Sequence, residues 1–213
     1  MATITQLTTD TTSGNKFISK SQFDDWAGNY TGEEPSEYIM SGSLLDDLDE
    51  DFLGDSDAVA ITFYFGITST RNDWVFLLTG TKDSGEDVYD SNQIYYLQEG
   101  VTSSQSTSAS NAATWANAYK TEIGGSYTAE NPGAFILFKG YFNNLRNQSG
   151  VAMIKVVRGV DDDDKNVIML AAADSNGDIL ESLTYQYLER SRPCPPYPGC
   201  DSATSTNRSN HQF

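Results

Sequence analysis

The chain has 213 residues, of which 30 are acidic and 13 are basic, giving a formal net charge of −17. This charge opposes binding to phosphate backbones and to anionic lipid surfaces, so nucleic acid is a poor candidate partner. Hydrophobic residues at 38% and aromatic residues at 12% are enough for a packed core, which argues against wholesale disorder.

No apolar run approaches the roughly 18 residues that a membrane-spanning helix needs. The beginning of the chain also lacks the basic region and the apolar segment of a secretory signal. We therefore expect no membrane insertion and a cytoplasmic location, with surface or extracellular assembly by a non-classical route as the alternative.

The first half is expected to begin with an edge strand at residues 2–8, followed by a helix from Ser19 or Ser21 to about Tyr30. A second helix follows Pro35 and carries an apolar stripe of Leu44, Leu45, Leu48 and Phe52. Three predicted strands complete this half, at residues 59–67, 74–78 and 94–97. The first of them alternates and should be half-buried, whereas the continuous apolar run of the second indicates a strand covered on both sides.

The second half repeats this order. A helix is expected at residues 110–123, and a second helix after Pro132 carries the stripe Phe138, Tyr141, Phe142 and Leu145. Its predicted strands are 151–157, 167–173 and 183–188. The low-complexity stretch 100–111 between the halves is interpreted as a surface linker, and residues 190–213 as a tail without helix or strand.

The two halves share sequence as well as order. Residues 30–48 and 127–145 align in one register, and Trp26 and Tyr30 recur in a second WxxxY as Trp115 and Tyr119. The identical pairs of the first alignment are Tyr30/Tyr127, Thr31/Thr128, Glu33/Glu130, Pro35/Pro132, Ile39/Ile136 and Leu48/Leu145. This similarity predicts an internal duplication.

The fold class that follows is α+β, with two tandem pseudo-repeats that form antiparallel sheet packed with helices. The first pseudo-repeat covers residues 1–99 and the second covers 112–189. Each has the order helix, helix, strand, strand, strand. Because one repeat is too small for a generous core, we expect the two to pack as one compact unit.

The segment 174–178, DSNGD, resembles the start of a calcium loop. An EF-hand needs Gly at the sixth position and Glu at the twelfth, but here Gly177 is fourth and Ile179 is sixth. A hairpin turn is therefore favoured, with Asp174, Asn176 and Asp178 as weak candidates for metal ligands. The run of four aspartates at 161–164 is likewise interpreted as a solvated turn, with weak binding of a divalent ion as the alternative.

The two cysteines, Cys194 and Cys200, either close a small disulfide loop or remain free, and the Pro and Gly residues between them favour the disulfide. Two thiols and one distant histidine, His211, cannot supply a four-ligand zinc site. A catalytic arrangement on His211 would place its general base three residues from the end of the chain. We therefore expect no nucleophilic catalysis of this kind.

Two repeated features have a functional alternative. Glu33 and Glu130 stand at equivalent positions before a proline, which is typical of a helix-entry turn, although a catalytic carboxylate pair is the alternative. The repeated WxxxY residues are expected in the core, with stacking on a ligand as the alternative. With no glycine loop for a nucleotide, the sequence predicts no cofactor and no enzymatic activity.

Residues 134–180, together with the terminal CPPYPGC, resemble a group of uncharacterised bacterial proteins. Their pattern is an aromatic-rich FLFGK-like helix entry, a Gln-x-Gly turn, a hairpin, a D-x-x-G turn and a CPP-type end. Here Phe138, Lys139 and Gly140 depart from the FGK order. The resemblance implies a bacterial origin and a Cys-Pro end that is a regular part of such proteins, but it implies no function.

Charge differs between the halves, because residues 1–106 carry a net −15 and residues 107–213 carry −2. This difference favours a self-assembling structural or scaffold protein, a homo-oligomer or filament with head-to-tail contacts. The acidic side of that interface would be Asp46, Asp47, Asp49, Glu50 and Asp51, and the basic side Lys139, Arg146, Lys155 and Arg158. The alternative is a regulatory module that binds a small ligand or a protein in the cleft between the halves.

Overall fold

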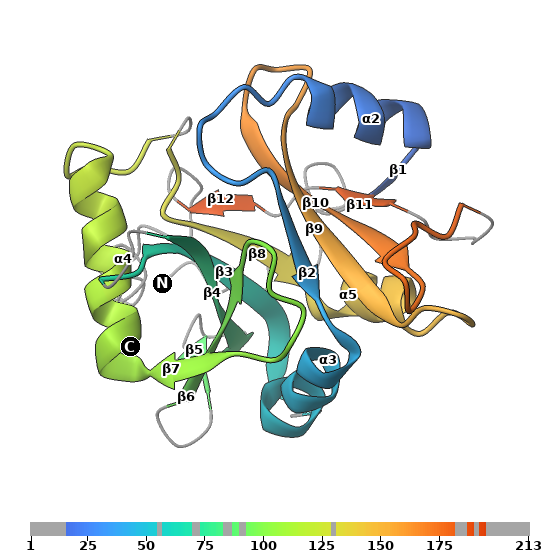
Figure 1. Cartoon of the computed structure of the whole chain (residues 1–213), viewed down its shortest axis with the longest axis horizontal. Helices are drawn as coiled ribbons and strands as arrows, with labels where there is room; N and C mark the ends of the chain where they lie inside the picture. Colours follow the sequence, from blue (N-terminus) through green and yellow to red (C-terminus); the bar gives the residue numbers. More distant parts are fainter. Residues whose placement is uncertain are drawn as a thin grey trace.

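Two antiparallel sheets packed against each other form the centre of the protein (Figure 1). The computed structural model describes residues 16–54, 57–69, 73–82, 87–89, 93–128, 131–181, 187–189 and 192–194. Within these residues the fold is α+β, with four α-helices and a short π-helix. The predicted fold class is therefore confirmed at this level.

The first sheet has five strands in the order β1-β11-β10-β9-β2. Every neighbouring pair in it is antiparallel. Its strands are β1 (Lys16–Ile18), β11 (Tyr187–Glu189), β10 (Asn166–Ala173), β9 (Met153–Val160) and β2 (Glu37–Met40).

The second sheet has seven strands in the order β12-β8-β3-β4-β6-β7, and β5 (Asp87–Val88) pairs with β4 beside this path. Its neighbouring pairs are also antiparallel. The other strands are β12 (Arg192–Cys194), β8 (Ala134–Phe138), β3 (Ala58–Ile67), β4 (Trp74–Lys82), β6 (Gln93–Gln98) and β7 (Ser106–Ser108).

Each sheet takes strands from both halves of the chain. In the first sheet β2 lies beside β9, with Tyr38 opposite Val156. In the second sheet β8 lies beside β3, with Ile136 opposite Thr62. The sequence halves therefore interlock through backbone hydrogen bonds, and neither sheet belongs to one half alone.

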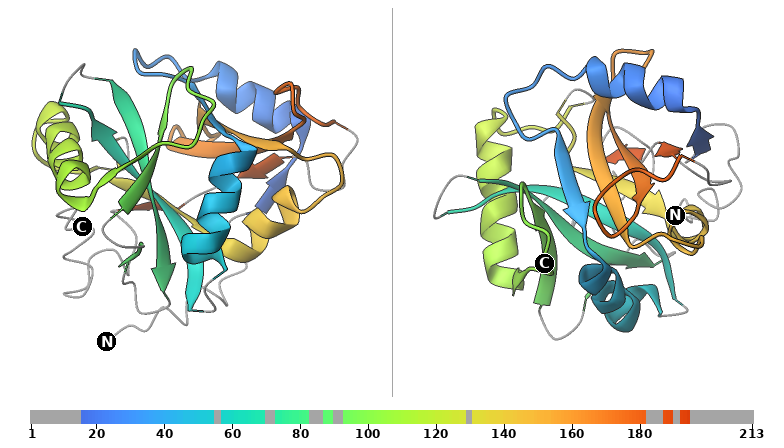
Figure 2. Two further views of the ribbon diagram at one scale, coloured as in Figure 1. Left: turned by 60° about the horizontal axis from the view of Figure 1, so that its bottom comes forward. Right: turned by 45° about the vertical axis from the view of Figure 1, so that its right-hand side comes forward.

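Helices cover the outer faces of the two sheets, so the order of layers is helix, sheet, sheet, helix (Figure 2). Helix α2 (Lys20–Gly28) packs Phe23 and Trp26 on the β9-β10 side, and α4 (Ala109–Glu122) packs Ala112 and Ala116 on the β3-β4 side. The remaining helices, α3 (Gly42–Leu48) and α5 (Lys139–Arg146), bury their leucines and Phe142 in the core between the sheets. The π-helix η1 (Asp49–Leu53) continues α3.

Local sequence explains where the first helices begin. The hydroxyl of Ser19 accepts a hydrogen bond from the backbone N–H of Gln22, and the Gln22 side chain accepts one from the N–H of Ser19, which is a capping box. Ser41 and Ser108 cap α3 and α4 with the hydroxyl alone, which accepts the backbone N–H of Leu44 and of Asn111, respectively. The predicted cap at Ser19 is thus confirmed, and α4 begins one residue before the predicted Ser110.

Strand β3 is buried on both faces, although its alternation predicted one exposed face. Ile61, Phe63 and Phe65 face the core between the sheets, while Ala60 and Tyr64 pack with α4 on the other face. The polar face predicted at Thr62 is covered, and the Thr62 hydroxyl hydrogen-bonds that of Thr81 at 2.6 Å. The prediction failed because the covering helix comes from the other half of the chain.

Three further expectations are corrected, and one falls on residues that the structure does not describe. Residues 37–40 and 134–138 form strands β2 and β8, where only the approach to a helix was predicted. The stretch 100–111 is not all linker, since it contains β7 and the first turn of α4. The tail does contain a strand, because the backbone of β12 pairs with β8. The edge strand predicted at residues 2–8 lies outside the described residues.

None of the helices in the described part of the chain is both long and apolar enough to span a membrane. The predicted third strand of the second half is described only over Tyr187–Glu189, as β11.

Candidate ligand-binding site

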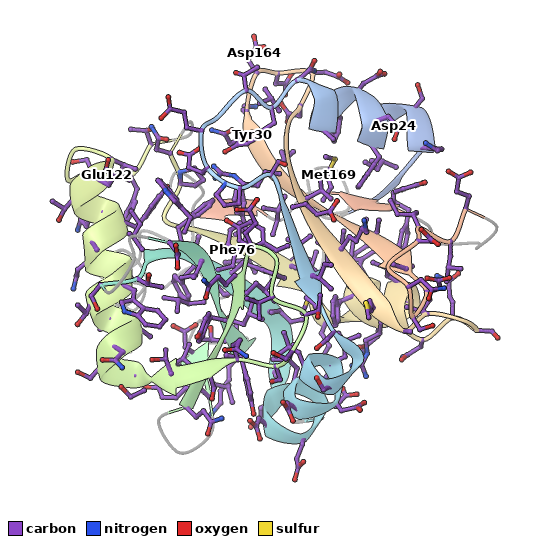
Figure 3. The ribbon with its side chains drawn as sticks, in the orientation of Figure 1. Asp24, Tyr30, Phe76, Glu122, Asp164 and Met169 are labelled. Atoms are coloured by element: carbon purple, nitrogen blue, oxygen red, sulfur yellow. The ribbon has the colours of Figure 1, made fainter. Side chains whose placement is uncertain are left out.

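A pocket of about 270 Å³ opens where the loop after α2 meets the end of β9. Its residues come from both halves of the chain, and one of them, Tyr30, is marked in Figure 3 in the loop between α2 and β2. The lining consists of Tyr30, Thr31, Gly32, Glu34, Asn131, Arg158, Val160 and Asn166. The walls are mostly polar, and they include one cation and one anion.

Arg158 is held in place by β9. Its backbone N–H donates to the carbonyl oxygen of Ser36 at 2.8 Å, which extends the pairing of β9 with β2. Residues alternate between the faces of a strand, so Arg158 shares a face with Ile154 and Val156, which lie in the core between the sheets. Arg158 is only 8% exposed as a result.

The Arg158 guanidinium lies against two aromatic rings and one carboxylate. Its central carbon is 4.6 Å from the ring centroid of Tyr30 and 5.1 Å from that of Phe65. Its Nη1 is 3.6 Å from Glu34 Oε2, which is an ion pair but too long for a hydrogen bond. Among the described residues Nη1 has no hydrogen-bond partner. A buried donor left without an acceptor costs about 1–3 kcal/mol, so packing alone does not account for this arginine.

Glu34 is fixed from the other side by Tyr30. The Tyr30 hydroxyl donates a 2.5 Å hydrogen bond to Glu34 Oε2. Burial raises the pKa of Tyr30 well above its ordinary value, and the bond to Glu34 raises it further. Tyr30 therefore stays a donor at neutral pH. Gly32, which lies between Tyr30 and Glu34 in the sequence, leaves room for their hydrogen bond. A Cβ at residue 32 would collide with the Tyr30 hydroxyl and the Glu34 carboxylate.

An aromatic column continues from the pocket into the fold. The Phe65 ring stacks on Tyr119 with centroids 4.9 Å apart and planes at 21°, and Tyr119 stacks on Tyr127 at 6.3 Å and 16°. The Tyr119 hydroxyl donates to the carbonyl oxygen of Pro132 at 2.8 Å, which ties α4 to the segment before β8. This column forms the wall behind Arg158, because the Phe65 ring contacts the guanidinium.

The repeated aromatic residues take different roles. Trp26 and Tyr119 are buried in hydrophobic clusters, and Trp115 packs at the edge of one. Tyr30 instead lines the pocket. The core interpretation therefore holds for three of these residues, and a ligand could stack only on Tyr30.

Three of the four basic residues predicted at a head-to-tail interface form ion pairs inside the chain. Arg146 pairs with Asp49, Lys155 pairs with Glu37 at 3.0 Å, and Arg158 pairs with Glu34. The fourth, Lys139, is the first residue of α5. Assembly between molecules stays a prediction, but three of its four basic residues, and Asp49 on the acidic side, form ion pairs within one molecule.

The acidic residues of that interface are also partly engaged within the chain. Asp47 accepts a hydrogen bond from the Ser104 hydroxyl, and Asp51 accepts one from the Tyr95 hydroxyl. Asp46 and Glu50 are exposed.

The segment 174–178 forms a tight turn. Asp174 Oδ1 accepts the backbone N–H groups of Asn176 at 2.8 Å and Asp178 at 3.0 Å, and Gly177 has a φ of +85°. These backbone hydrogen bonds hold the pKa of Asp174 below its usual value. In the part of the chain that the structure describes, no three His, Cys, Asp or Glu side chains are grouped so that they could hold a metal ion.

The aspartate run at 161–164 connects β9 to β10. Asp161 is 2% exposed, and its Oδ1 accepts the N–H groups of Asp163 at 2.9 Å and Lys165 at 3.0 Å. Asp162 Oδ1 accepts the indole N–H of Trp26 at 2.9 Å. The first two aspartates thus have structural roles, but only Asp161 is buried, and Asp162, Asp163 and Asp164 are exposed.

Several predicted site residues cannot be placed. The side chain of Cys194 lies outside the described residues, as do Cys200, His211 and Glu130, so the disulfide and the carboxylate pair stay untested. Glu33 is exposed, and the residue that reaches the pocket is its neighbour Glu34. Glu34 was not predicted as a site residue, although its spacing of four residues from Tyr30 was a signal.

The comparisons with known proteins gave no match: no protein-family model, no curated protein and no solved structure is significantly similar to this chain. The resemblance to the uncharacterised bacterial group accordingly stays a prediction.

Proposed function

We propose that the protein is a binding module whose pocket, lined by Tyr30, Glu34 and Arg158, holds a small polar ligand between the two halves of the chain. The observation that carries the proposal is the buried guanidinium of Arg158, which lines a pocket and has a donor without an acceptor. A ligand acceptor would offset the cost of that donor. This is the second of the two functions that the sequence suggested.

The proposal includes the duplication predicted from the sequence, in which two copies of one unit exchange strands. The first sheet has the order β1-β11-β10-β9-β2, and the second sheet, read from its other edge, has the order β7-β6-β4-β3-β8. The strands at each position of these two orders come from opposite halves of the chain and are matched as equivalents. The helices follow the same match, since the caps Ser19 and Ser108 each begin the helix that carries the tryptophan of a WxxxY segment.

Glycines in the two central strands support the same match. Gly66 pairs with Val75 in β3 and β4, and Gly159 pairs with Val167 in β9 and β10. A Cβ at Gly66 would press on the side chain of Trp115, and one at Gly159 would press on the backbone of Trp26. Each glycine therefore leaves room for the helix of the other copy at the tryptophan of its WxxxY segment.

This match makes Phe65 and Arg158 equivalent, because each precedes its glycine. The first copy places an aromatic ring at this core position, and the second copy places a charged guanidinium there. Burying a charge where the equivalent position holds an apolar ring is costly unless a partner compensates it. We take the substitution as the change that gave the duplicated fold a polar site.

The experiment is a thermal-shift screen of the full chain against a panel of small polar metabolites. A ligand that binds the folded state alone stabilises it by about 2.7 kcal/mol at one hundred times its Kd, which raises Tm. We expect at least one member of the panel to do so. The test variant is Arg158→Met, in which the ligand shift should disappear. Glu34 loses its ion-pair partner, but it keeps the Tyr30 hydrogen bond and is 25% exposed, so Tm without ligand should change little.

The matched control is Lys155→Gln. Lys155 lies on the same strand, but its side chain points to the opposite face and pairs with Glu37 outside the pocket. This variant should keep the ligand shift. A panel without any stabilising member, or a shift that survives in Arg158→Met, would contradict the proposed function.

A further inference from the structure

We infer that the ligand of this pocket is a small zwitterion of the amino-acid class, with its carboxylate on Arg158 and its ammonium group on Glu34. The inference rests on the proposed binding function and adds the chemical class of the ligand. It is carried by four features of the site: the unmet donor of Arg158, the open oxygen of Glu34, the charge balance and the size of the pocket.

A carboxylate fits Arg158 best. A guanidinium presents several N–H donors in a planar fork that matches the two oxygens of a carboxylate, and charge-assisted bonds of this kind are about twice as strong as neutral ones. The rings of Tyr30 and Phe65 hold the guanidinium in one orientation, so little freedom is lost when the ligand binds. The arginine is already desolvated at 8% exposure, which strengthens the attraction.

An ammonium group fits Glu34. Both contacts of this carboxylate, to the Tyr30 hydroxyl and to Arg158, use Oε2. A carboxylate has about four acceptor positions, so Oε1 retains the capacity to accept donors from a ligand. The Glu34 side chain is 25% exposed, which leaves it within reach from the pocket.

The charges of the pocket and of the whole chain favour a ligand that is neutral overall. The lining contains one cation and one anion, and the chain carries −17. A simple anion would be repelled by the field of the chain, and a simple cation would face Arg158. A zwitterion meets both charges of the site and has no net charge of its own.

Size and lining restrict the class further. Pockets for drug-sized ligands measure about 300–1,000 Å³, and this one measures about 270 Å³. Thr31, Asn131 and Asn166 add a hydroxyl and two amide groups to the wall. A single polar amino acid is therefore the expected occupant, rather than a longer peptide.

Isothermal titration of the full chain with the proteinogenic amino acids tests the inference. For the tightest binder, two analogues are then compared: the acid that lacks the amino group and the amine that lacks the carboxylate. We expect each analogue to bind about tenfold or more weakly, because each loses one charge-assisted contact. Glucose serves as the neutral polar probe and should not bind.

Two variants assign each contact. In Arg158→Met, the amino acid and its decarboxylated amine should bind equally weakly, since the partner of the carboxylate is gone. In Glu34→Gln, the amino acid and its deaminated acid should bind equally weakly. Lys155→Gln should keep the affinities of the unchanged chain.

The possible outcomes separate this inference from the proposed function. If glucose or an analogue binds as tightly as every amino acid and Arg158→Met abolishes that binding, the pocket is a binding site but the zwitterion assignment is wrong. If no amino acid, analogue or glucose binds and the wider metabolite screen also gives no shift, both are wrong.

Discussion

Gly159 lies so close to Trp26 that a Cβ atom at residue 159 would be 3.0 Å from the Trp26 carbonyl oxygen. The helix α2 therefore packs directly on the backbone of β9. We expect Gly159→Ala to force α2 away from the sheet and to lower the free energy of unfolding by about 1–3 kcal/mol, as overpacking does. Urea denaturation followed by circular dichroism measures the loss.

The equivalent change Gly66→Ala is the control. There the closest atoms to an added Cβ are side-chain carbons of Val75, Leu77 and Trp115 at 3.1–3.3 Å, which can move by a few tenths of an ångström. Its cost should be smaller than that of Gly159→Ala. Equal costs would mean that the close approach of α2 does not control packing.

A circular permutant tests the exchange of strands between two equivalent copies. Phe17 and Leu188 are paired neighbours in β1 and β11, in the place that Ser106 and Tyr95 occupy in the other sheet. The permuted chain starts at Ser106, joins residue 189 to residue 16 by a copy of loop 99–105, and ends at Gln98. We expect it to fold with the circular dichroism spectrum of the chain in its natural order.

The reference for the permutant is the chain of residues 16–189 in its natural order, which has the same elements and also lacks β12. We expect their urea midpoints to agree within the error of the measurement. A permutant that fails to unfold cooperatively, beside a reference that does, would argue against equivalent copies.

The ion pair between Arg146 and Asp49 distinguishes contacts within the chain from contacts between chains. The side chain of Arg146 is 13% exposed and that of Asp49 is 42% exposed, so solvent screens the pair and its coupling energy should be about 0.2–1 kcal/mol. A double-mutant cycle with Arg146→Met and Asp49→Asn measures it. Because the pair is intramolecular, the coupling should not change with protein concentration.

Light scattering of the same variants at low and high salt completes this test. A mass that rises with protein concentration at low salt, and that falls in Asp49→Asn, would favour the head-to-tail assembly predicted from the sequence. A mass that stays constant would contradict that assembly, and the charge pairs would then act only within one molecule.

The four aspartates of residues 161–164 should differ in their effect on stability. Asp161→Ala removes the acceptor of two backbone N–H groups in the turn, so we expect a loss of about 1–3 kcal/mol. Asp163→Ala changes a side chain that is 62% exposed and should stay within about 0.5 kcal/mol of the unchanged chain. Denaturation midpoints of the two variants check this, and equal losses would contradict it.

Buried tyrosines make stability sensitive to alkaline pH. Burial raises the pKa of Tyr38, Tyr119 and Tyr127 above the ordinary value of about 10. A raised pKa contributes stability that is fully present below the unfolded value and is lost as pH rises towards the folded value. The free energy of unfolding should therefore fall above about pH 10, and the tyrosinate absorbance of these three residues should appear only on unfolding.

The variant Tyr38→Phe isolates one of these groups. Each tyrosine that stays protonated in the fold contributes a slope of about 1.4 kcal/mol per pH unit in this range. Removing Tyr38 should reduce the slope by about that amount and leave stability at neutral pH nearly unchanged. An unchanged slope would mean that Tyr38 ionises without unfolding.

Much of the secondary structure could be predicted because its signals are local. The cap at Ser19 and the apolar stripe of Phe142 and Leu145 fix α2 and α5 from residues within one or two turns. The alternation in β3 and the apolar run in β4 likewise identify strands that the structure contains.

The short strands could not be predicted in the same way. β2 has four residues and β8 has five, and each is stabilised by pairing with a long strand of the other half. Their own residues contain too little pattern to separate a strand from the approach to a helix. The burial of both faces of β3 also escaped prediction, because α4 covers it from a distant part of the sequence.

The sequence by itself determined which groups the chain can bring to a site. These are a repeated aromatic motif, an acidic first half and a second half that contains most of the arginines and lysines. Only the tertiary structure decided that Arg158 meets Glu34 and Tyr30 of the same molecule and lines a pocket with them. The physical reason is that strands of one half of the chain pair with strands of the other, which brings residues from distant segments together. Charge and spacing along the chain specify which groups are present, but that pairing specifies which of them are neighbours.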